Sequence, residues 1–239
     1  MTTKGIILAG GEGKRLQPLG LGVPKPLVAI NEKPLINHNL ELFARYGVND
    51  VAVIIRPADR TVFTAWKEKY EGAFPDVRIT LMEEPIPMGT LGYFFHHMKE
   101  WMDGQDVFVT NGDDIKDIDL AEMAQAHRRL GAPATIALMK MERPDDYGVV
   151  LVSADYVTNF LEKEPGLPPG LVSAGMYLIS PAAFTHMAQG LPADEKFLMF
   201  EKHMFPVLAA KGKLAAFVAQ GSFYDCGTPE RLTKAIREV

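Results

Sequence analysis

The stretch GIILAGGEGKR, residues 5–15, does most to decide the fold of this chain. Its start, Gly5–Leu8, has the apolar composition of a short buried strand, and glycines 10, 11 and 13 follow at once. Glycines placed after a strand let backbone N–H groups approach a phosphate closely, and Arg15 and Lys25 then supply positive charge. The stretch therefore indicates a phosphate-binding loop, with a plain structural turn as the alternative.

Two better-known glycine loops do not fit this stretch. A Walker A loop needs a glycine five residues before the Gly13-Lys14 pair, and none stands there. The dinucleotide fingerprint needs a third glycine where Leu16 stands. These mismatches argue against a P-loop NTPase and against a dinucleotide-binding oxidoreductase.

Outward from the glycine loop, apolar runs alternate with amphipathic segments. This alternation predicts an α/β protein with a Rossmann-like mixed, mainly parallel sheet and helices on both faces, which binds ligands at the carboxyl ends of its strands. The expected strands are Gly5–Leu8, Val51–Ile55, Val77–Met82 and Val107–Thr110, and the expected helices are Ile36–Tyr46, Arg60–Tyr70, Leu91–Met102 and a segment capped by Asp119 that runs to Leu130.

The second half of the chain is richer in strands. Those expected are Thr135–Met139, Gly148–Val152, Val157–Leu161, Val172–Ile179 and Leu214–Val218, with helices at Phe200–Ala210 and Pro229–Val239. No long linker or repeat interrupts the sequence. We therefore expect one domain over residues 1–239, with a nucleotide-binding half at about 1–132 and an acceptor-binding half at 133–239.

Composition narrows the function classes. A net charge of −5 argues against non-specific electrostatic binding to nucleic acid or to an anionic membrane. The single cysteine, Cys226, excludes an internal disulfide, and no apolar run resembles a signal peptide or a membrane span. We expect a cytoplasmic protein with no nucleic-acid or membrane partner.

Carboxylates mark two further candidate sites. Asn111-Gly112-Asp113-Asp114 follows an expected strand, and such a strand end suits a hard cation, although a simple turn explains it equally well. Asp225 lies between an aromatic residue and Cys226, whereas helix capping accounts for Thr228, Pro229 and Glu230. The pair Glu162-Lys163 could face a substrate or be an ordinary solvated strand end.

Together these segments resemble the sugar-phosphate nucleotidyltransferase (nucleoside-diphosphate-sugar pyrophosphorylase) family. The opening pattern spans Leu8–Leu19 and Pro24–Leu27, and later markers follow in order at Gly89-Thr90, Asn111–Asp113, Tyr147–Val150, Glu162-Lys163, Ser173–Tyr177 and Asp225–Pro229. Within the family, the resemblance is to mannose or heptose 1-phosphate guanylyltransferases and glucose 1-phosphate thymidylyltransferases. Lys14 replaces the usual Thr, Tyr224 the usual Trp, and Ser173 the usual Asn, which blurs the identity of the sugar.

The resemblance implies a magnesium-dependent enzyme that joins a nucleoside monophosphate from an NTP to a sugar 1-phosphate. It implies catalytic roles for Arg15, Lys25, Asp113 and Lys163, with Mg²⁺ held by Asp113 and Asp225. The implied nucleotide-binding residues are Leu8, Gly10, Gly11, Gly13, Lys14, Glu84, Pro87, Gly89, Thr90, Asn111 and Gly112. The implied sugar-phosphate-binding residues are Tyr147, Gly148, Glu162, Lys163, Ser173, Gly175 and Tyr177. By analogy with the family, the chain could also form a homodimer.

The identity of the base depends on Glu84. A carboxylate only accepts hydrogen bonds, and guanine offers donors at N1 and N2, so the sequence favours GTP with a mannose- or heptose-type acceptor. The alternatives are UTP or dTTP with glucose 1-phosphate, a CTP:phosphocholine cytidylyltransferase, and a non-catalytic regulatory subunit that binds a nucleotide sugar.

Overall fold

A computed structural model describes residues 3–11, 22–142, 144, 147–161, 166–188 and 195–239. It divides into two compact units. The glycine-loop unit comprises Thr3–Ile86, Val109–Ile118 and Gly221–Val239, and the strand-ring unit comprises Pro87–Phe108 and Asp119–Gln220. These compact units are interleaved along the chain, because the C-terminal segment pairs with elements of the first half. The nucleotide-binding half at about 1–132 and the acceptor-binding half at 133–239 stay a prediction.

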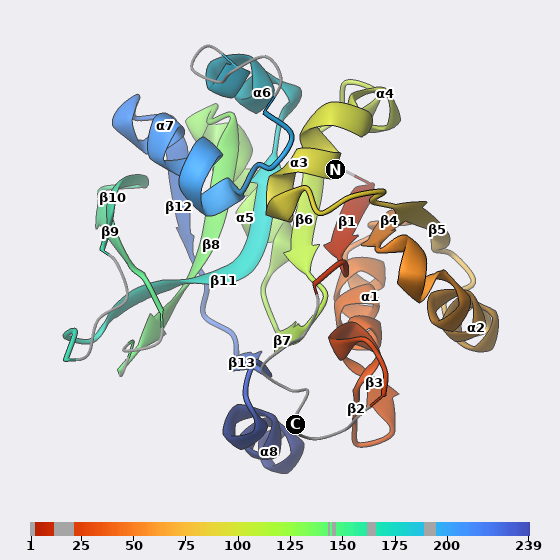
Figure 1. The fold of residues 1–239 in the computed structure, drawn as a ribbon. Helices are drawn as coiled ribbons and strands as arrows, with labels where there is room; N and C mark the ends of the chain where they lie inside the picture. Colours follow the sequence, from red (N-terminus) through yellow and green to blue (C-terminus); the bar gives the residue numbers. More distant parts are fainter. Residues whose placement is uncertain (1–2, 12–21, 143, 145–146, 162–165, 189–194) are drawn as a thin grey trace. The chain divides into compact units, whose positions relative to one another are not determined.

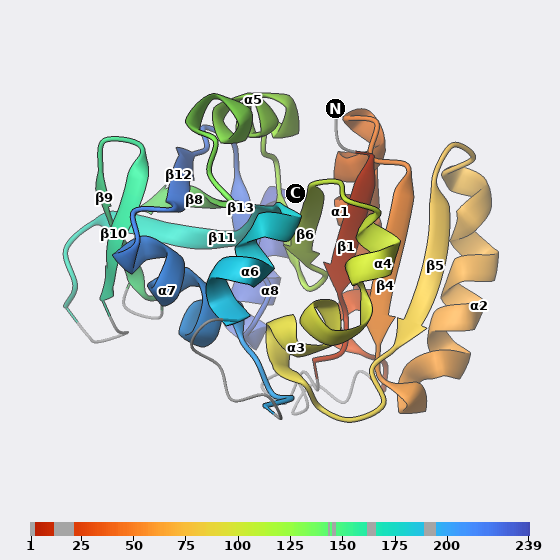
Figure 2. The same ribbon diagram turned by 90° about the horizontal axis from the view of Figure 1, so that it is seen from above.

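Parallel strands form the frame of the glycine-loop unit. Strands β1 (Lys4–Leu8), β4 (Asp50–Ile55) and β5 (Arg78–Glu83) pair in parallel in the order β5-β4-β1, and the end of β6 (Val107–Asn111) comes next. The connections are the helices α1 (Leu35–Arg45) and α2 (Arg60–Tyr70), and α2 runs alongside β5 (Figure 2). These elements confirm the predicted α/β alternation, since β4 is wholly buried and both helices are amphipathic.

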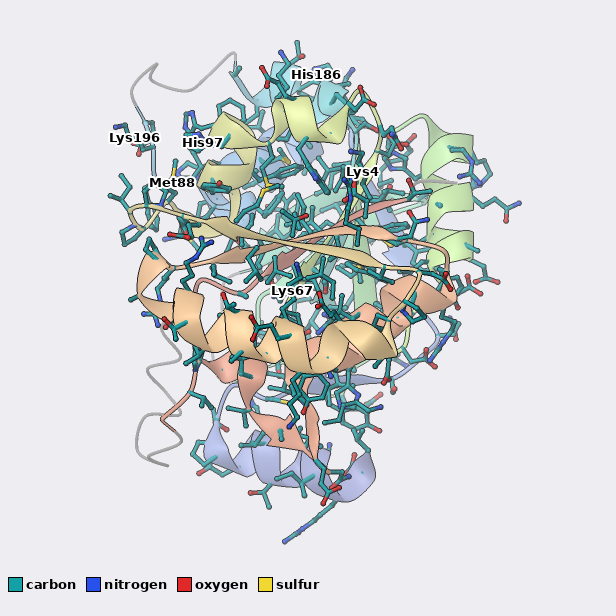
Figure 3. The ribbon with its side chains drawn as sticks, turned by 90° about the vertical axis from the view of Figure 1, so that its right-hand side faces the viewer. Lys4, Lys67, Met88, His97, His186 and Lys196 are labelled. Atoms are coloured by element: carbon teal, nitrogen blue, oxygen red, sulfur yellow. The ribbon has the colours of Figure 1, made fainter. Side chains whose placement is uncertain are left out.

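Figure 3 views the molecule from the side on which α2 lies, with Lys67 of this helix labelled. Phe63 and Trp66 are the buried residues of this helix, and the Trp66 indole donates a hydrogen bond of 2.8 Å to Oδ1 of Asn37 on α1. The shorter elements nearby are the 3₁₀ turns η3 (Pro57–Asp59) and η4 (Glu71–Ala73).

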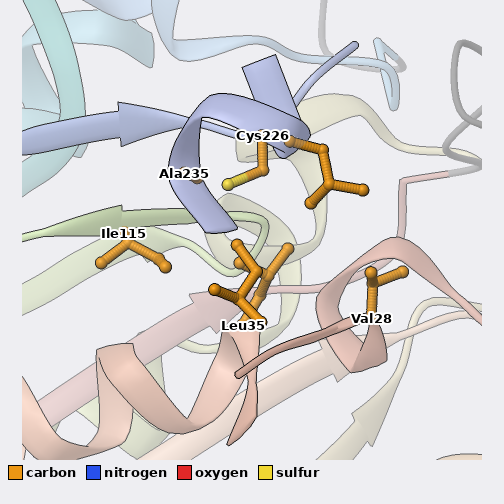
Figure 4. Close-up of a cluster of buried hydrophobic side chains, with 7 residues drawn as sticks. Val28, Leu35, Ile115, Cys226 and Ala235 are labelled. Carbon is orange, nitrogen blue, oxygen red and sulfur yellow. The ribbon is translucent and has the colours of Figure 1, made fainter. Parts of the chain in front are cut away.

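The C-terminal segment completes the glycine-loop unit. Strand β13 (Phe223–Asp225) pairs antiparallel with β7 (Asp114–Lys116), and α8 (Pro229–Glu238) follows it (Figure 1). Thr228 caps α8 by accepting a bond from the Arg231 N–H, as the sequence predicted. An apolar cluster holds this segment in place (Figure 4); its residues are Val28, Ile30, Leu35, Ile115, Cys226, Leu232 and Ala235. One side of the cluster comes from the segment that holds the 3₁₀ turn η2 (Lys25–Leu27) and the hairpin of β2 (Ala29–Ile30) and β3 (Lys33–Pro34). The other side comes from β7, from Cys226 after β13, and from α8.

The strand-ring unit departs from the expected mainly parallel sheet. Its strands are β8 (Ala134–Met141), β9 (Val149–Ser153), β10 (Tyr156–Leu161), β11 (Gly170–Ile179) and β12 (Leu214–Val218). They follow the order β11-β8-β12-β10-β9, and β9 also pairs with β11, so the five strands close on themselves. All of these pairings are antiparallel except that of β8 with β12. The tight turn between β9 and β10 requires that pair to be antiparallel, since only antiparallel neighbours can be joined by so short a connection.

Two helices of the strand-ring unit differ from their predictions. The expected helix Leu91–Met102 breaks at Met98 into α3 (Gly89–His97) and α4 (Lys99–Met102). The expected helix Phe200–Ala210 starts with a π-helical turn, η5 (Phe200–Met204), before α7 (Phe205–Ala210). Pro206 explains this start, because its missing N–H cannot donate to the preceding turn. The remaining helices are α5 (Leu120–Leu130), capped by Asp119 as expected, and α6 (Pro181–Ala188). Within the described ranges, no helix has the length and apolar character needed to cross a bilayer.

A buried chain of polar groups links α5 to β8 and α6. His127 Nδ1 lies 2.8 Å from the Thr135 hydroxyl and Nε2 lies 2.9 Å from the Ser180 hydroxyl. Ser180 donates in turn to Asp106 at 2.5 Å, which leaves its oxygen to accept from Nε2–H. Burial lowers the pKa of His127, so the neutral ring fits this chain of bonds.

Candidate functional site

The glycine loop leaves β1 between two other strand ends. Ala9 N–H donates to Ile54 O on β4 at 2.9 Å, and Gly112 N–H donates to Leu8 O at 3.0 Å. A Cβ on Gly112 would stand 2.8 Å from Ile7 Cγ2 and 3.0 Å from Leu8 O, so a side chain there would force the two segments apart. Leu8, Gly10, Gly11, Asn111 and Gly112, all predicted nucleotide-binding residues, thus lie in adjoining segments of one unit.

Lys25 and Asp113 form the central ion pair of this region. Lys25 Nζ lies 2.8 Å from Asp113 Oδ2. The Lys25 side chain is 8% exposed in η2, whereas Asp113 is 40% exposed, so the carboxylate is open to solvent above a buried cation. The structure therefore brings together two residues that the sequence placed 88 positions apart.

Asp225 reaches the same region through β13. It is the register partner of Asp114, the residue next to Asp113. Its carboxylate accepts a 2.6 Å bond from the Gly227 N–H and pairs with the Arg231 guanidinium of α8. Both predicted metal ligands thus lie on or beside the paired segments β7 and β13, and Arg231 is a further charged neighbour that the sequence analysis missed. The only indication of Arg231 in the sequence was its position, three residues after the Thr228 cap and six after Asp225.

A buried polar network lies beside Asp113 and was also missed. The Lys116 side chain is 0% exposed and its ammonium pairs with Asp114. It also donates to the Thr110 hydroxyl at 2.7 Å and to Asn39 Oδ1 at 3.2 Å, and Asn39 Nδ2 donates to Asp114 O at 3.0 Å. Burial raises the pKa of Asp114 to about 7, and the Lys116 ammonium opposes this rise. The network fixes the backbone on both sides of Asn111–Asp113.

Glu84 approaches the glycine loop from the end of β5. Glu84 is buried, and its backbone N–H donates a hydrogen bond of 2.8 Å to Ile55 O. Glu84 Oε2 lies 2.9 Å from where a Cβ of Gly10 would stand. The bare face of Gly10 therefore adjoins a carboxylate, as a site that reads hydrogen-bond donors requires.

The predicted nucleotide-binding residues Pro87, Gly89 and Thr90 belong to the strand-ring unit. Gly89 has a φ of 76°, and a Cβ there would stand 2.3 Å from Leu198 O, so only glycine fits. Thr90 Oγ1 accepts a 3.1 Å bond from Phe200 N–H and donates to Glu201 at 3.2 Å. These contacts give both residues structural roles, and their contact with a nucleotide stays a prediction.

The described sugar-site candidates cluster around β9 and β11. Tyr147 and Gly148 precede β9, and a Cβ on Gly148 would stand 3.0 Å from Leu161 O. Ser173 and Gly175 lie at a register shift of β11 against β8, where the Gly175 N–H donates to Ser173 Oγ at 3.3 Å. Tyr177 is buried against Phe200 and Phe205, with ring centroids 5.0 and 4.9 Å away. Its ring therefore packs in an aromatic core and does not lie open in a pocket.

Five predicted residues lie outside the described part of the chain: Gly13, Lys14, Arg15, Glu162 and Lys163. Within the part that is described, no three His, Cys, Asp or Glu side chains group as a ready-made metal cluster. Burial raises the pKa of the Cys226 thiol to about 12, which keeps it protonated at neutral pH and agrees with the absence of a predicted nucleophilic role.

The sequence profile of the family described as "Nucleotidyl transferase" matches residues 4–239. The chain belongs to this family. It is 34% identical over 238 residues to the probable mannose-1-phosphate guanylyltransferase 1 of Oryza sativa subsp. japonica, a match that covers 98% of this chain and 64% of the rice protein. This chain spans less than two thirds of the length of the first curated relatives that it matches.

Solved structures share the fold of this family member. A putative glucose-1-phosphate thymidylyltransferase from Bacillus anthracis, in complex with a sucrose, gives a TM-score of 0.82 at 21% identity, covering 99% of this chain and 96% of that one. HddC from Yersinia pseudotuberculosis, complexed with GMP-PN, gives 0.80 at 23% identity, covering 99% of both chains. The fold class expected from the sequence is thus confirmed as a mixed α/β nucleotidyltransferase fold, with a closed five-strand ring in place of part of the parallel sheet.

Proposed function

We propose that this protein transfers a nucleoside monophosphate from an NTP to a sugar 1-phosphate and releases pyrophosphate. The observation that carries the proposal is the Lys25–Asp113 pair, set beside the glycine loop and next to the strand that bears Asp225. The family match supports the reaction class, and a resemblance to mannose-1-phosphate guanylyltransferases supports GTP and mannose 1-phosphate as substrates.

The reaction needs charge control more than acid–base chemistry. An oxygen of the sugar phosphate attacks the α-phosphorus, the bond from that phosphorus to the bridging oxygen breaks, and pyrophosphate leaves with the electron pair. A phosphate oxygen is already a nucleophile at neutral pH, so no general base is required. The difficulty is to bring two polyanions together, and positioning of this kind can lower a barrier by roughly 7–11 kcal/mol.

The chain's own residues suit these tasks. Backbone N–H groups of Gly10 and Gly11 would bind phosphate oxygens, and Lys25 would neutralise charge on the reacting phosphates. Arg15 and Lys163 would add positive charge at the pyrophosphate and at the sugar phosphate.

The carboxylates fit a divalent cation. Oxygen donors are what Mg²⁺ prefers, and among the described residues Asp113 bonds only Lys25, through Oδ2, which leaves Oδ1 for another ligand. Asp113 and Asp225 would hold the ion. When bound, Mg²⁺ supplies charge neutralisation at the phosphates that react.

The proposed base is guanine. Glu84, buried beside Gly10, offers only acceptors, and these match the N1 and N2 donors of guanine. Uracil and thymine each offer one donor between two acceptors, which is a poorer match.

The test is pyrophosphate release over a panel of GTP, UTP, dTTP, CTP and ATP. Each nucleotide is paired with mannose 1-phosphate, glucose 1-phosphate and phosphocholine, with Mg²⁺ or with EDTA. We expect release with GTP and mannose 1-phosphate that requires Mg²⁺. Equal or better use of UTP or dTTP would defeat the guanine assignment, phosphocholine use with CTP would support the cytidylyltransferase, and no release with any pair would indicate a non-catalytic subunit.

A further inference from the structure

Arg56 occupies the position directly after β4, at the same strand edge as the glycine loop. Its Nε lies 2.7 Å from Asp59 Oδ2 and its Nη2 lies 3.1 Å from Asp59 Oδ1, a two-bond fork that fixes the plane of the guanidinium. Asp59 is largely buried and Arg56 is about one third exposed, so the arginine is held from the protein side and open on the other. Among the described residues, Nη1 has no hydrogen-bond partner.

The same arginine borders the bare face of Gly10. A Cβ on Gly10 would stand 3.9 Å from Arg56 Cγ and 2.9 Å from Glu84 Oε2. The three residues follow the parallel neighbours β1, β4 and β5, which explains why they meet at one edge. A planar group bound at Gly10 would therefore have the Glu84 carboxylate and the Arg56 side chain as neighbours.

Guanine matches this pair of charges along two adjacent edges. Its N1 and N2 groups are donors, suited to Glu84, and the neighbouring O6 and N7 atoms are acceptors, suited to arginine. Adenine presents a donor where guanine has O6, and the pyrimidines have no N7. Asp59 occupies Nε and one side of Nη2, so the Nη1 side of the fork is available for such acceptors.

We propose that Arg56, oriented by Asp59, is a specificity-determining residue that reads O6 and N7 of a guanine nucleotide while Glu84 reads N1 and N2. This inference rests on the proposed function for its substrate class. It assigns to the β4 end a contact that the sequence analysis did not identify.

The test is equilibrium binding of GTP, 7-deaza-GTP and ITP to the full chain with Mg²⁺ and without sugar phosphate, measured by calorimetry. 7-Deaza-GTP lacks the N7 acceptor, and ITP lacks the 2-amino donor. We expect the wild type to bind GTP on the order of 10-fold more tightly than 7-deaza-GTP, because a bidentate arginine contact to O6 and N7 discriminates by that order. In Arg56→Met this preference falls to near one, while the preference over ITP, which Glu84 supplies, is retained.

The control is Arg60→Met. Arg60 lies four residues after Arg56, is exposed and pairs with Glu83, so this variant loses the same charge outside the proposed contact. It should keep both preferences. Each preference is a ratio of two affinities measured on one protein preparation, so partial unfolding of a variant does not change it. Arg56→Lys is a second test variant, because it keeps the positive charge but loses the two-bond fork of the guanidinium.

Two results overturn the inference: a wild type that binds GTP and 7-deaza-GTP equally, or an Arg56→Met variant that keeps the wild-type preference. Failure of the proposed function would give a different result: the binding preferences would be present, but no pyrophosphate would be released when sugar phosphates are added.

Discussion

Lys25 Nζ lies 2.8 Å from Asp113 Oδ2, so a nearly buried ammonium supports a carboxylate that is exposed to solvent. The cation comes from a 3₁₀ turn after the glycine loop, and the anion lies between β6 and β7. This arrangement holds one carboxylate oxygen in place and leaves the other without a hydrogen bond from any described residue. It is the geometry expected of a residue that binds a ligand and is kept oriented by the protein.

Replacing Asp113 should separate its role in activity from its role in folding. We expect Asp113→Asn to lower kcat by more than about 100-fold, since even partners of metal ligands are worth 10- to 100-fold. The free energy of unfolding should change by less than about 1.5 kcal/mol, because the amide oxygen of the asparagine can still accept the hydrogen bond from the Lys25 ammonium. Pyrophosphate release and urea unfolding measure the two effects, with the exposed Asp103→Asn as the control. Near-normal turnover would remove Asp113 from the mechanism.

Asp225 poses a sharper question, because it already pairs with Arg231. If Asp225 is a metal ligand, Asp225→Asn should raise the Mg²⁺ concentration for half-maximal activity by about 10-fold or more. Arg231→Gln should leave that concentration at or below the wild-type value and lower the free energy of unfolding by roughly 1–3 kcal/mol, the value of a charged hydrogen bond. The same Mg²⁺ dependence in wild type and Asp225→Asn would mean that Asp225 serves only the ion pair.

The Lys116 network should matter chiefly for stability. Lys116→Met leaves the Asp114 carboxylate buried without its ammonium partner, and we expect a loss of about 3–5 kcal/mol in the free energy of unfolding. The double variant Asp114→Asn/Lys116→Met should recover part of this loss, because it buries no unpaired charge. Urea unfolding of both, beside the exposed Lys140→Met, tests this; equal losses in the single and double variants would contradict it.

Local sequence patterns predicted the elements that depend on local physics. The apolar runs of β1 and β4 and the caps Asp119 and Thr228 follow from period and side-chain chemistry, and each appears within a residue or two of its predicted place. The ring of five strands could not be predicted in this way, because β9 pairs with β11 over contacts that no local pattern encodes.

The candidate site shows the same division. Asp113 was found because a carboxylate after a buried strand is a local signal. Lys116 was missed because its burial depends on Asn39, 77 positions earlier, and a lysine in a short polar stretch normally indicates an exposed one. Arg231 was missed because helix capping already explained the residues around it, and its contact with Asp225 depends on how β13 leads into α8.

The buried His127 chain predicts how stability changes with pH. Burial lowers the pKa of His127 below its ordinary value of 6.5, the Asp106 carboxylate opposes this, and Arg128 adds to it. The unfolded chain therefore binds a proton below pH 6.5 that the folded protein does not. Stability falls as pH decreases from 6.5 toward the lower folded pKa, by at most about 1.4 kcal/mol per pH unit.

His127→Gln should remove this part of the pH dependence. The variant is less stable than wild type at pH 7.5, because the bonds to Thr135 and Ser180 are disturbed, and the difference between the two should shrink as the pH is lowered to 5.5. Urea unfolding at steps of half a pH unit measures it, and His97→Gln, at an exposed position on α3, should follow the wild-type curve. A constant difference between wild type and His127→Gln across this range would show that His127 takes up its proton equally in both states, and the neutral-ring hydrogen-bond chain would then have to be abandoned.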